Sequence, residues 1–106
     1  MKFRIPNRFR QNLYVLLRQA GYFPLHDRLS GKNSYARRLS SNRYPRFHLY
    51  LQEDSQTITF DLHLDQIPSR FTGQTAHNAD YNSSEVKEEL IRIYSFFYPQ
   101  LIDSKK

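Results

Sequence analysis

Strict alternation of apolar and polar residues over residues 44–65 predicts two β-strands joined by a polar turn. Successive strand residues point to opposite sides of a sheet, so this hairpin has one apolar and one polar face. The apolar set is Phe47, Leu49, Leu51, Ile58, Phe60, Leu62 and Leu64. The polar set is His48, Tyr50, Thr59, Asp61, His63 and Asp65. A site on this sheet would therefore use the second face, with its imidazoles and carboxylates.

The predicted turn also sets a register. A turn centred on Asp54 and Ser55 pairs His48 with Asp61, and the apolar residues then meet one another across the hairpin. The sequence therefore predicts a cross-strand contact between an imidazole and a carboxylate.

Two further segments carry apolar residues at helical spacing. The first spans residues 8–20 and should stop at Gly21, and the second starts at the N-S-S-E sequence from Asn82 and should end at Pro99. Between the first helix and the hairpin, residues 22–25 and 34–39 could form short strands on either side of a turn at residues 30–33. The polar segment 66–82 is long enough to predict a functional loop or disorder.

These elements predict a single α+β domain over residues 1–106. We expect a two-layer sandwich in which two helices cover one face of a small antiparallel sheet of two to four strands, in the order α-β-(β)-β-β-α. The other face of the sheet should be wet. The predicted core is Phe9, Leu13, Leu16, Leu17, Phe47, Leu49, Leu51, Ile58, Phe60, Leu62, Leu64, Val86, Leu90, Ile93 and Phe97.

Composition narrows the chemistry. The chain has no cysteine, which excludes disulfides and thiolate sites and is typical of a reducing compartment. Its longest apolar run, residues 13–17, is too short for a signal sequence or a membrane span, so we expect a cytoplasmic protein that uses no membrane. The three glycines are scattered at positions 21, 31 and 73, which argues against a phosphate-binding loop and a nucleotide cofactor.

Charge is distributed unevenly along the chain. Residues 1–50 hold eleven lysines and arginines, nine of them arginine, against one acidic residue, whereas the remainder is net acidic. Arginine binds phosphate through two parallel hydrogen bonds and tyrosine stacks on unpaired bases, so this half predicts a nucleic-acid surface. Its candidate residues are Tyr35, Arg37, Arg38, Arg43, Tyr44 and Arg46. The alternative is a solvated or protein-binding surface.

RNA is the more fitting nucleic acid, or a ribonucleoprotein. A helix that binds in the major groove of DNA must be basic and must have a side that does not pack in the core. Neither predicted helix meets both conditions. The sequence thus favours RNA over duplex DNA.

The polar hairpin face admits three interpretations. It could be a hydrogen-bonded sheet face with no further role. It could hold Zn or Fe(II) through His48, His63 and Asp65, completed by His77 from the 66–82 segment. It could instead use His48 or His63 as a general acid or base beside Arg46, with Asp61 or Asp65 fixing the tautomer. No known nucleophile motif accompanies these residues.

Two resemblances accompany these patterns. The L-L-R-Q-A-G-Y sequence at residues 16–22 and the element order resemble the double-stranded-RNA-binding-like class that includes HicA-type toxin ribonucleases. Such toxins carry Gly-Ser-His where this chain has Asn33-Ser34-Tyr35, so their catalysis does not carry over. The Y-P-R-F-H-L-Y-L, D-L-H-L-D-Q and T-A-H-N-A-D-Y sequences are similar to an uncharacterised family of small basic proteins from candidate-phyla bacterial genomes, which implies no function.

The sequence therefore favours a small cytoplasmic RNA-binding domain over an enzyme. The alternatives are a metal- or histidine-dependent hydrolase or ribonuclease on the polar sheet face, and a protein-interaction module. No cofactor is required, apart from the divalent metal that the histidine site could take.

Overall fold

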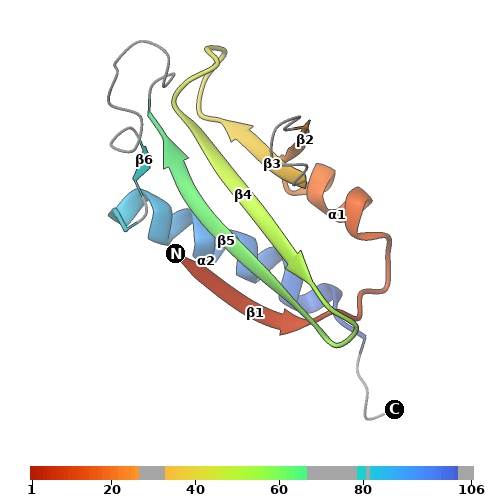
Figure 1. Ribbon diagram of the computed structural model, residues 1–106. Helices are drawn as coiled ribbons and strands as arrows, with labels where there is room; N and C mark the ends of the chain where they lie inside the picture. The colour runs from red at the N-terminus through yellow and green to blue at the C-terminus, as the bar shows by residue number, and fades with distance from the viewer. Residues whose placement is uncertain (27–32, 67–78, 81, 103–106) are drawn as a thin grey trace.

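The computed structural model describes residues 1–26, 33–66, 79–80 and 82–102 (Figure 1). In chain order its elements are β1 (Lys2–Pro6), α1 (Leu13–Gln19), β2 (Phe23–His26), β3 (Asn33–Arg38), β4 (Arg46–Glu53), β5 (Thr57–Asp65), β6 (Ala79–Asp80), α2 (Ser84–Phe97) and a short 3-10 helix at Tyr98–Gln100. The α+β class, the antiparallel sheet and the two helices are as predicted. Each helix contributes one apolar side to a single core that it shares with the apolar face of the hairpin.

The sheet is larger than the sequence predicted. Within the described residues it has six strands in the order β1-β5-β4-β3-β2, with β6 paired to β5. Pairing is antiparallel throughout, and β1 and β6 occupy successive parts of the same edge of β5. The predicted limit of four strands was therefore wrong, and so was the helix-first order. The alternation of Phe3 and Ile5 with charged residues was the signal for the missed first strand.

The hairpin register also differs from the prediction. His48 lies opposite His63, Arg46 opposite Asp65 and Leu49 opposite Leu62. The cause is the turn, which lies one residue later than predicted. The Asp54 carboxylate accepts hydrogen bonds from the backbone N–H groups of Gln56 and Thr57, and these bonds fix the later turn. Each partner moves by two residues, so the two faces keep their predicted members while the predicted pairing of His48 with Asp61 is lost.

The predicted core is confirmed, and long-range packing extends it. All fifteen predicted residues lie in the core cluster or pack against it; Phe9, Leu13 and Leu51 are only partly buried. The cluster also contains Ile5, Ala20, Tyr22 and Tyr35.

Helix α1 is shorter than predicted at its start. Residues 8–10 are held in extended backbone pairing with residues 100–102, through Arg10 N–H to the Gln100 carbonyl at 3.0 Å and Ile102 N–H to the Arg8 carbonyl at 2.8 Å. The helix therefore begins after Asn12, whose side chain caps it.

The predicted stop of α1 at Gly21 is confirmed. Gly21 adopts a φ of 98° and donates to the Arg18 carbonyl, while Tyr22 donates to the Leu17 carbonyl. These bonds form a Schellman motif, in which the left-handed position favours glycine. A Cβ there would also approach the Arg37 side chain to 3.2 Å.

Helix α2 is fastened to the end of α1 by a buried carboxylate. Ser83 caps α2 by accepting the Val86 N–H, and two turns further on Glu89 accepts the Tyr22 hydroxyl at 2.7 Å and two donors of Arg92 at 2.8 Å. Arg92 also donates to the Ala20 carbonyl. Burial and the neighbouring Glu89 carboxylate raise the pKa of Tyr22, which therefore stays a neutral donor.

The first prediction tests this fastening. Glu89→Ala should lower the free energy of unfolding by about 3 kcal/mol, because it leaves the buried Tyr22 hydroxyl without its acceptor and Arg92 without its ion pair. The exposed neighbour Glu88→Ala should change it by about 0.5 kcal/mol or less. Urea denaturation measures both, and equal stabilities of the two variants would contradict the assignment.

Candidate functional site

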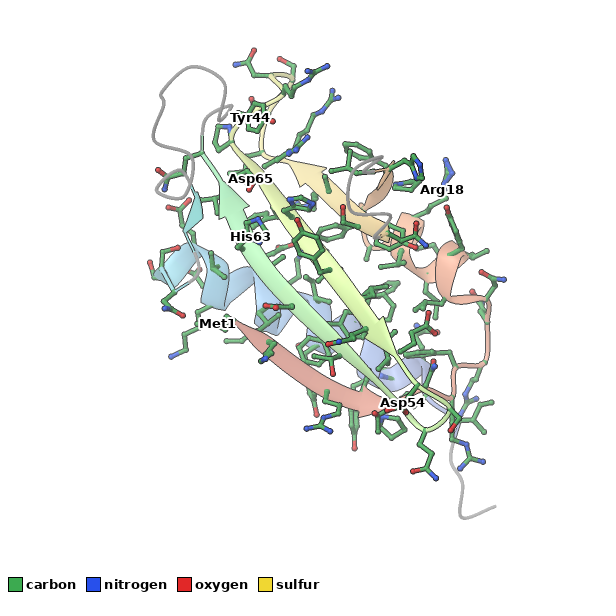
Figure 2. All side chains as sticks on the ribbon, viewed as in Figure 1. Met1, Arg18, Tyr44, Asp54, His63 and Asp65 are labelled. Carbon is green, nitrogen blue, oxygen red and sulfur yellow. The ribbon has the colours of Figure 1, made fainter. Side chains whose placement is uncertain are left out.

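The candidate site lies on the sheet face turned away from α2, which we call the outer face. Figure 2 shows His63 and Asp65 on this face, toward the end of the sheet that carries Tyr44 and away from the Asp54 turn. Cross-strand pairing builds two rows there. One row joins Ala36, His48 and His63, and the next joins Arg38, Arg46 and Asp65. Three adjacent strands therefore bring the sequence-predicted histidines and arginines together.

Asp65 is the centre of a hydrogen-bonded group that we call the Asp65 cluster. One carboxylate oxygen, Oδ2, accepts from His48 Nδ1 at 2.9 Å and from Arg46 Nε at 3.2 Å. The other, Oδ1, lies 2.9 Å from His63 Nε2. The second ring nitrogen of His48, Nε2, lies 2.9 Å from Ser34 Oγ. The cluster thus comprises Ser34, Arg46, His48, His63 and Asp65.

The cluster keeps Asp65 ionised. Burial favours the neutral carboxyl, but the hydrogen bonds from His48 and His63 outweigh burial, so the pKa of Asp65 lies well below its usual range. An ionised Asp65 can only accept hydrogen bonds, so each facing ring nitrogen is the donor, which places N–H on His48 Nδ1 and His63 Nε2. His48 Nε2 can then accept from the Ser34 hydroxyl.

The outer face is less wet here than the sequence predicted. Ser34 is 3% exposed and His63 7% exposed. The Tyr50 ring lies over both imidazoles, with centroids 4.6 Å from His48 and 5.6 Å from His63. Aromatic cover therefore shields the cluster from water and strengthens its electrostatic interactions.

Of the predicted metal ligands, the structure brings three together. The ligand atoms of His48, His63 and Asp65 all lie within 4.8 Å of one another, so this group could hold a metal ion. The fourth predicted ligand, His77, lies outside the described residues. Asp61, the predicted partner of His48, is instead half exposed and lies 3.7 Å from the α-amino group of Met1.

The predicted nucleic-acid residues divide between the two faces. Tyr35 is buried in the core and contacts Tyr14 edge-on. Arg37 lies on the same face of the sheet, which is the face covered by the helices, and its guanidinium is 3.5 Å from the Glu89 carboxylate. Neither residue extends the outer face. Arg38 and Arg43 are exposed, and the Arg46 guanidinium lies 4.7 Å above the Tyr44 ring. Arg38 and Arg46 lie opposite each other at the end of the sheet that holds the Asp65 cluster, and Arg43 and Tyr44 lie in the β3–β4 connection at that same end.

Sequence reasoning missed the part played by Ser34. Ser34 supplies the partner of His48 Nε2, and no motif in the sequence marks it. The available signal was its parity: in β3, Ser34 and Ala36 share one face with Arg38, whereas Tyr35 and Arg37 lie on the other. Identifying His48 as its partner required the cross-strand register.

Comparison with protein-family models, curated proteins and solved structures found no match for this chain. In the part of the chain that the structure describes, neither helix has the length and apolar character needed to cross a membrane.

A second prediction concerns acid stability. A carboxyl whose pKa is depressed on folding contributes stability above its unfolded pKa of about 4 and loses that contribution as the pH falls toward the folded value. Asp65→Asn should therefore be less stable than wild type by about 2 kcal/mol at neutral pH, and the difference should shrink below about pH 4.

Denaturant titrations at neutral and acid pH measure this effect. The control is Asp61→Asn, which alters a half-exposed carboxylate on the same strand and should leave stability within about 0.5 kcal/mol of wild type at both pH values. A stability difference for Asp65→Asn that does not change with pH would refute the ionised cluster.

Proposed function

We propose that this chain is a cytoplasmic RNA-binding domain that contacts single-stranded or looped RNA with the outer face of its sheet. The observation that carries the proposal is that Arg38, Arg46 and the β3–β4 connection with Arg43 and Tyr44 all lie at one end of that face. We call these four residues the Arg/Tyr surface. Arginines supply the phosphate contacts that dominate affinity, and an aromatic ring supplies a stacking platform.

The Tyr44 ring could stack on a base through one of its two sides. The Arg46 guanidinium lies 4.7 Å from the centre of this ring on one side, so a base would stack on the opposite side. A base–tyrosine–arginine stack would tolerate any sequence, because every base has a flat face. Arg38 and Arg43 would then neutralise the flanking phosphates.

The helices favour RNA over duplex DNA as the partner. Helix α1 has only seven residues and α2 carries the exposed Glu85 and Glu88 in its first half. An acidic helix is repelled by the phosphates that line a major groove, and a helix of seven residues with its apolar side in the core offers little surface to read bases. A basic sheet end with an aromatic ring instead suits unpaired nucleotides.

The third prediction tests this surface. Binding of an unstructured RNA should weaken linearly with log salt concentration, and Arg38→Ala or Arg43→Ala should each reduce the slope by about 0.7. Tyr44→Ala should weaken binding by about 1 to 3 kcal/mol with the slope unchanged. Fluorescence anisotropy at several salt concentrations measures both quantities.

A charge-matched control separates local contacts from net charge. Arg18 is exposed on α1, well apart from Tyr44 in Figure 2, and Arg18→Ala should leave the slope unchanged. Equal slope changes for Arg18→Ala and Arg43→Ala would reduce the proposal to nonspecific attraction. Absence of RNA binding at low salt would refute it and favour the protein-interaction alternative.

A second candidate function, hydrolysis of RNA, is favoured by the Asp65 cluster beside this surface. His48 and His63 are both oriented by one carboxylate, and Arg46 in the same cluster could contact a phosphate. The reaction would use the imidazoles as acid and base, or a divalent ion such as Zn²⁺ held by them.

The fourth prediction concerns this second function. His48→Gln should abolish RNA cleavage while leaving RNA affinity within about twofold of wild type, because the Arg/Tyr surface is intact. Gel analysis of labelled RNA, with and without chelator, measures the cleavage. Wild-type protein that binds RNA without cutting it would eliminate this candidate and retain the first.

A further inference from the structure

We propose that His48, His63 and Asp65 form a centre for a divalent metal ion of the Zn²⁺ type. The ligands would be Nδ1 of His48, Nε2 of His63 and the carboxylate of Asp65. This inference deepens the metal-dependent form of the second candidate function and is independent of RNA binding.

The backbone holds the three ligands in one place. His48 and His63 are directly opposite each other on adjacent strands, and Asp65 follows His63 by two residues, so all three side chains project from the same face. Sites built on paired strands are held more firmly than sites on loops. The geometry therefore does not depend on a loop closing over the ion.

The hydrogen bonds from His48 and His63 to Asp65 already bring the three ligand groups together at the position where the ion would bind. Both facing nitrogens lie 2.9 Å from an Asp65 oxygen, each joined to it by one proton. In a tetrahedral Zn²⁺ site with bonds of about 2.1 Å, ligand atoms are about 3.4 Å apart. Placing one ion between the ligands therefore requires shifts of about 0.5 Å at these two contacts. The three ligand atoms all lie within 4.8 Å of one another, so a separation wider than the tetrahedral value closes by at most about 1.4 Å, which side-chain torsions can supply. On metal binding the single proton of each neutral imidazole would move to its other ring nitrogen, so that the facing nitrogen presents its lone pair to the ion and, on His48, Nε2–H donates to Ser34 Oγ.

A supporting shell is already built around the proposed ligands. A metal-bound imidazole normally donates its second N–H to a nearby acceptor, which fixes the ring and its tautomer. His48 has such a partner in Ser34, whose Oγ lies 2.9 Å from Nε2. Arg46 holds one oxygen of Asp65 in the same way. Ser34 is nearly fully buried, so water would compete little for this bond.

The ligand set also indicates the kind of ion and site. Two imidazoles and one carboxylate suit Zn²⁺ or Fe²⁺ rather than Ca²⁺ or Mg²⁺, which prefer oxygen ligands. Three protein ligands would leave a coordination position for water or substrate, as in catalytic rather than structural zinc sites. The Arg46 cation opposes the ion, so we expect weaker binding than in a four-ligand zinc site.

Zinc titration of the chelator-stripped protein tests the proposal. Competition with a chromogenic chelator should give one Zn²⁺ per chain, and Co²⁺ should give the visible absorption of a tetrahedral site. His48→Gln, His63→Gln and Asp65→Asn should each weaken zinc binding by at least about 100-fold, whereas Ser34→Ala should weaken it by about 10- to 100-fold. Zn²⁺ should also raise the melting temperature of wild type but not of the ligand variants.

The controls are an exposed histidine and a second carboxylate. His26→Gln and Asp61→Asn should bind Zn²⁺ as wild type does, because neither side chain belongs to the cluster. Wild type that binds no Zn²⁺ at micromolar concentration, or His63→Gln that binds it as tightly as His26→Gln, would overturn the proposal. RNA binding by the stripped protein is measured separately, so failure of the metal centre is distinguishable from failure of the RNA surface.

Discussion

The register of the β4–β5 hairpin is the constraint on which the rest of this molecule depends. It is set at the turn, where the Asp54 carboxylate accepts two backbone N–H groups and the pKa of that carboxyl is lowered by those same bonds. From this turn the pairing runs along both strands and ends with Arg46 opposite Asp65. A local hydrogen-bonding preference at one end of the sheet therefore decides which side chains meet at the other end.

Alternation predicts faces, but it does not predict partners. A shift of two residues along β5 leaves every apolar residue in the core, because the side-chain period of a strand is two. The same shift exchanges Asp61 for His63 as the neighbour opposite His48 and brings Arg46 to Asp65. The polar face and its histidines could thus be predicted from the sequence. Their hydrogen-bonding partners depended on a turn whose centre differs by a single residue.

Other departures from the prediction have long-range causes. Residues 8–10 have helical spacing, yet they pair with residues 100–102 and stay extended, and this contact between the two ends of the described chain leaves no local signal. Tyr35 resembles an exposed aromatic residue in a basic segment, but strand parity turns it into the core beside Leu49. Tertiary packing overrides local pattern in both cases. The amphipathic stripe of α2 was long enough to predict its buried apolar residues directly, but not the buried Glu89.

Glu89 is buried and Asp65 is partly buried, and the difference between their hydrogen-bond donors indicates where chemistry is feasible. Glu89 is surrounded by a tyrosine hydroxyl and arginine donors, none of which gives up its proton near neutral pH, so this group only fastens α2 to the rest of the fold. Asp65 is contacted by one arginine as well, but its other donors are two imidazoles. An imidazole can release a proton and present a lone pair in its place. Asp65, unlike Glu89, is therefore held by imidazoles. These groups can bind a metal ion in place of a proton, or pass the proton to a substrate.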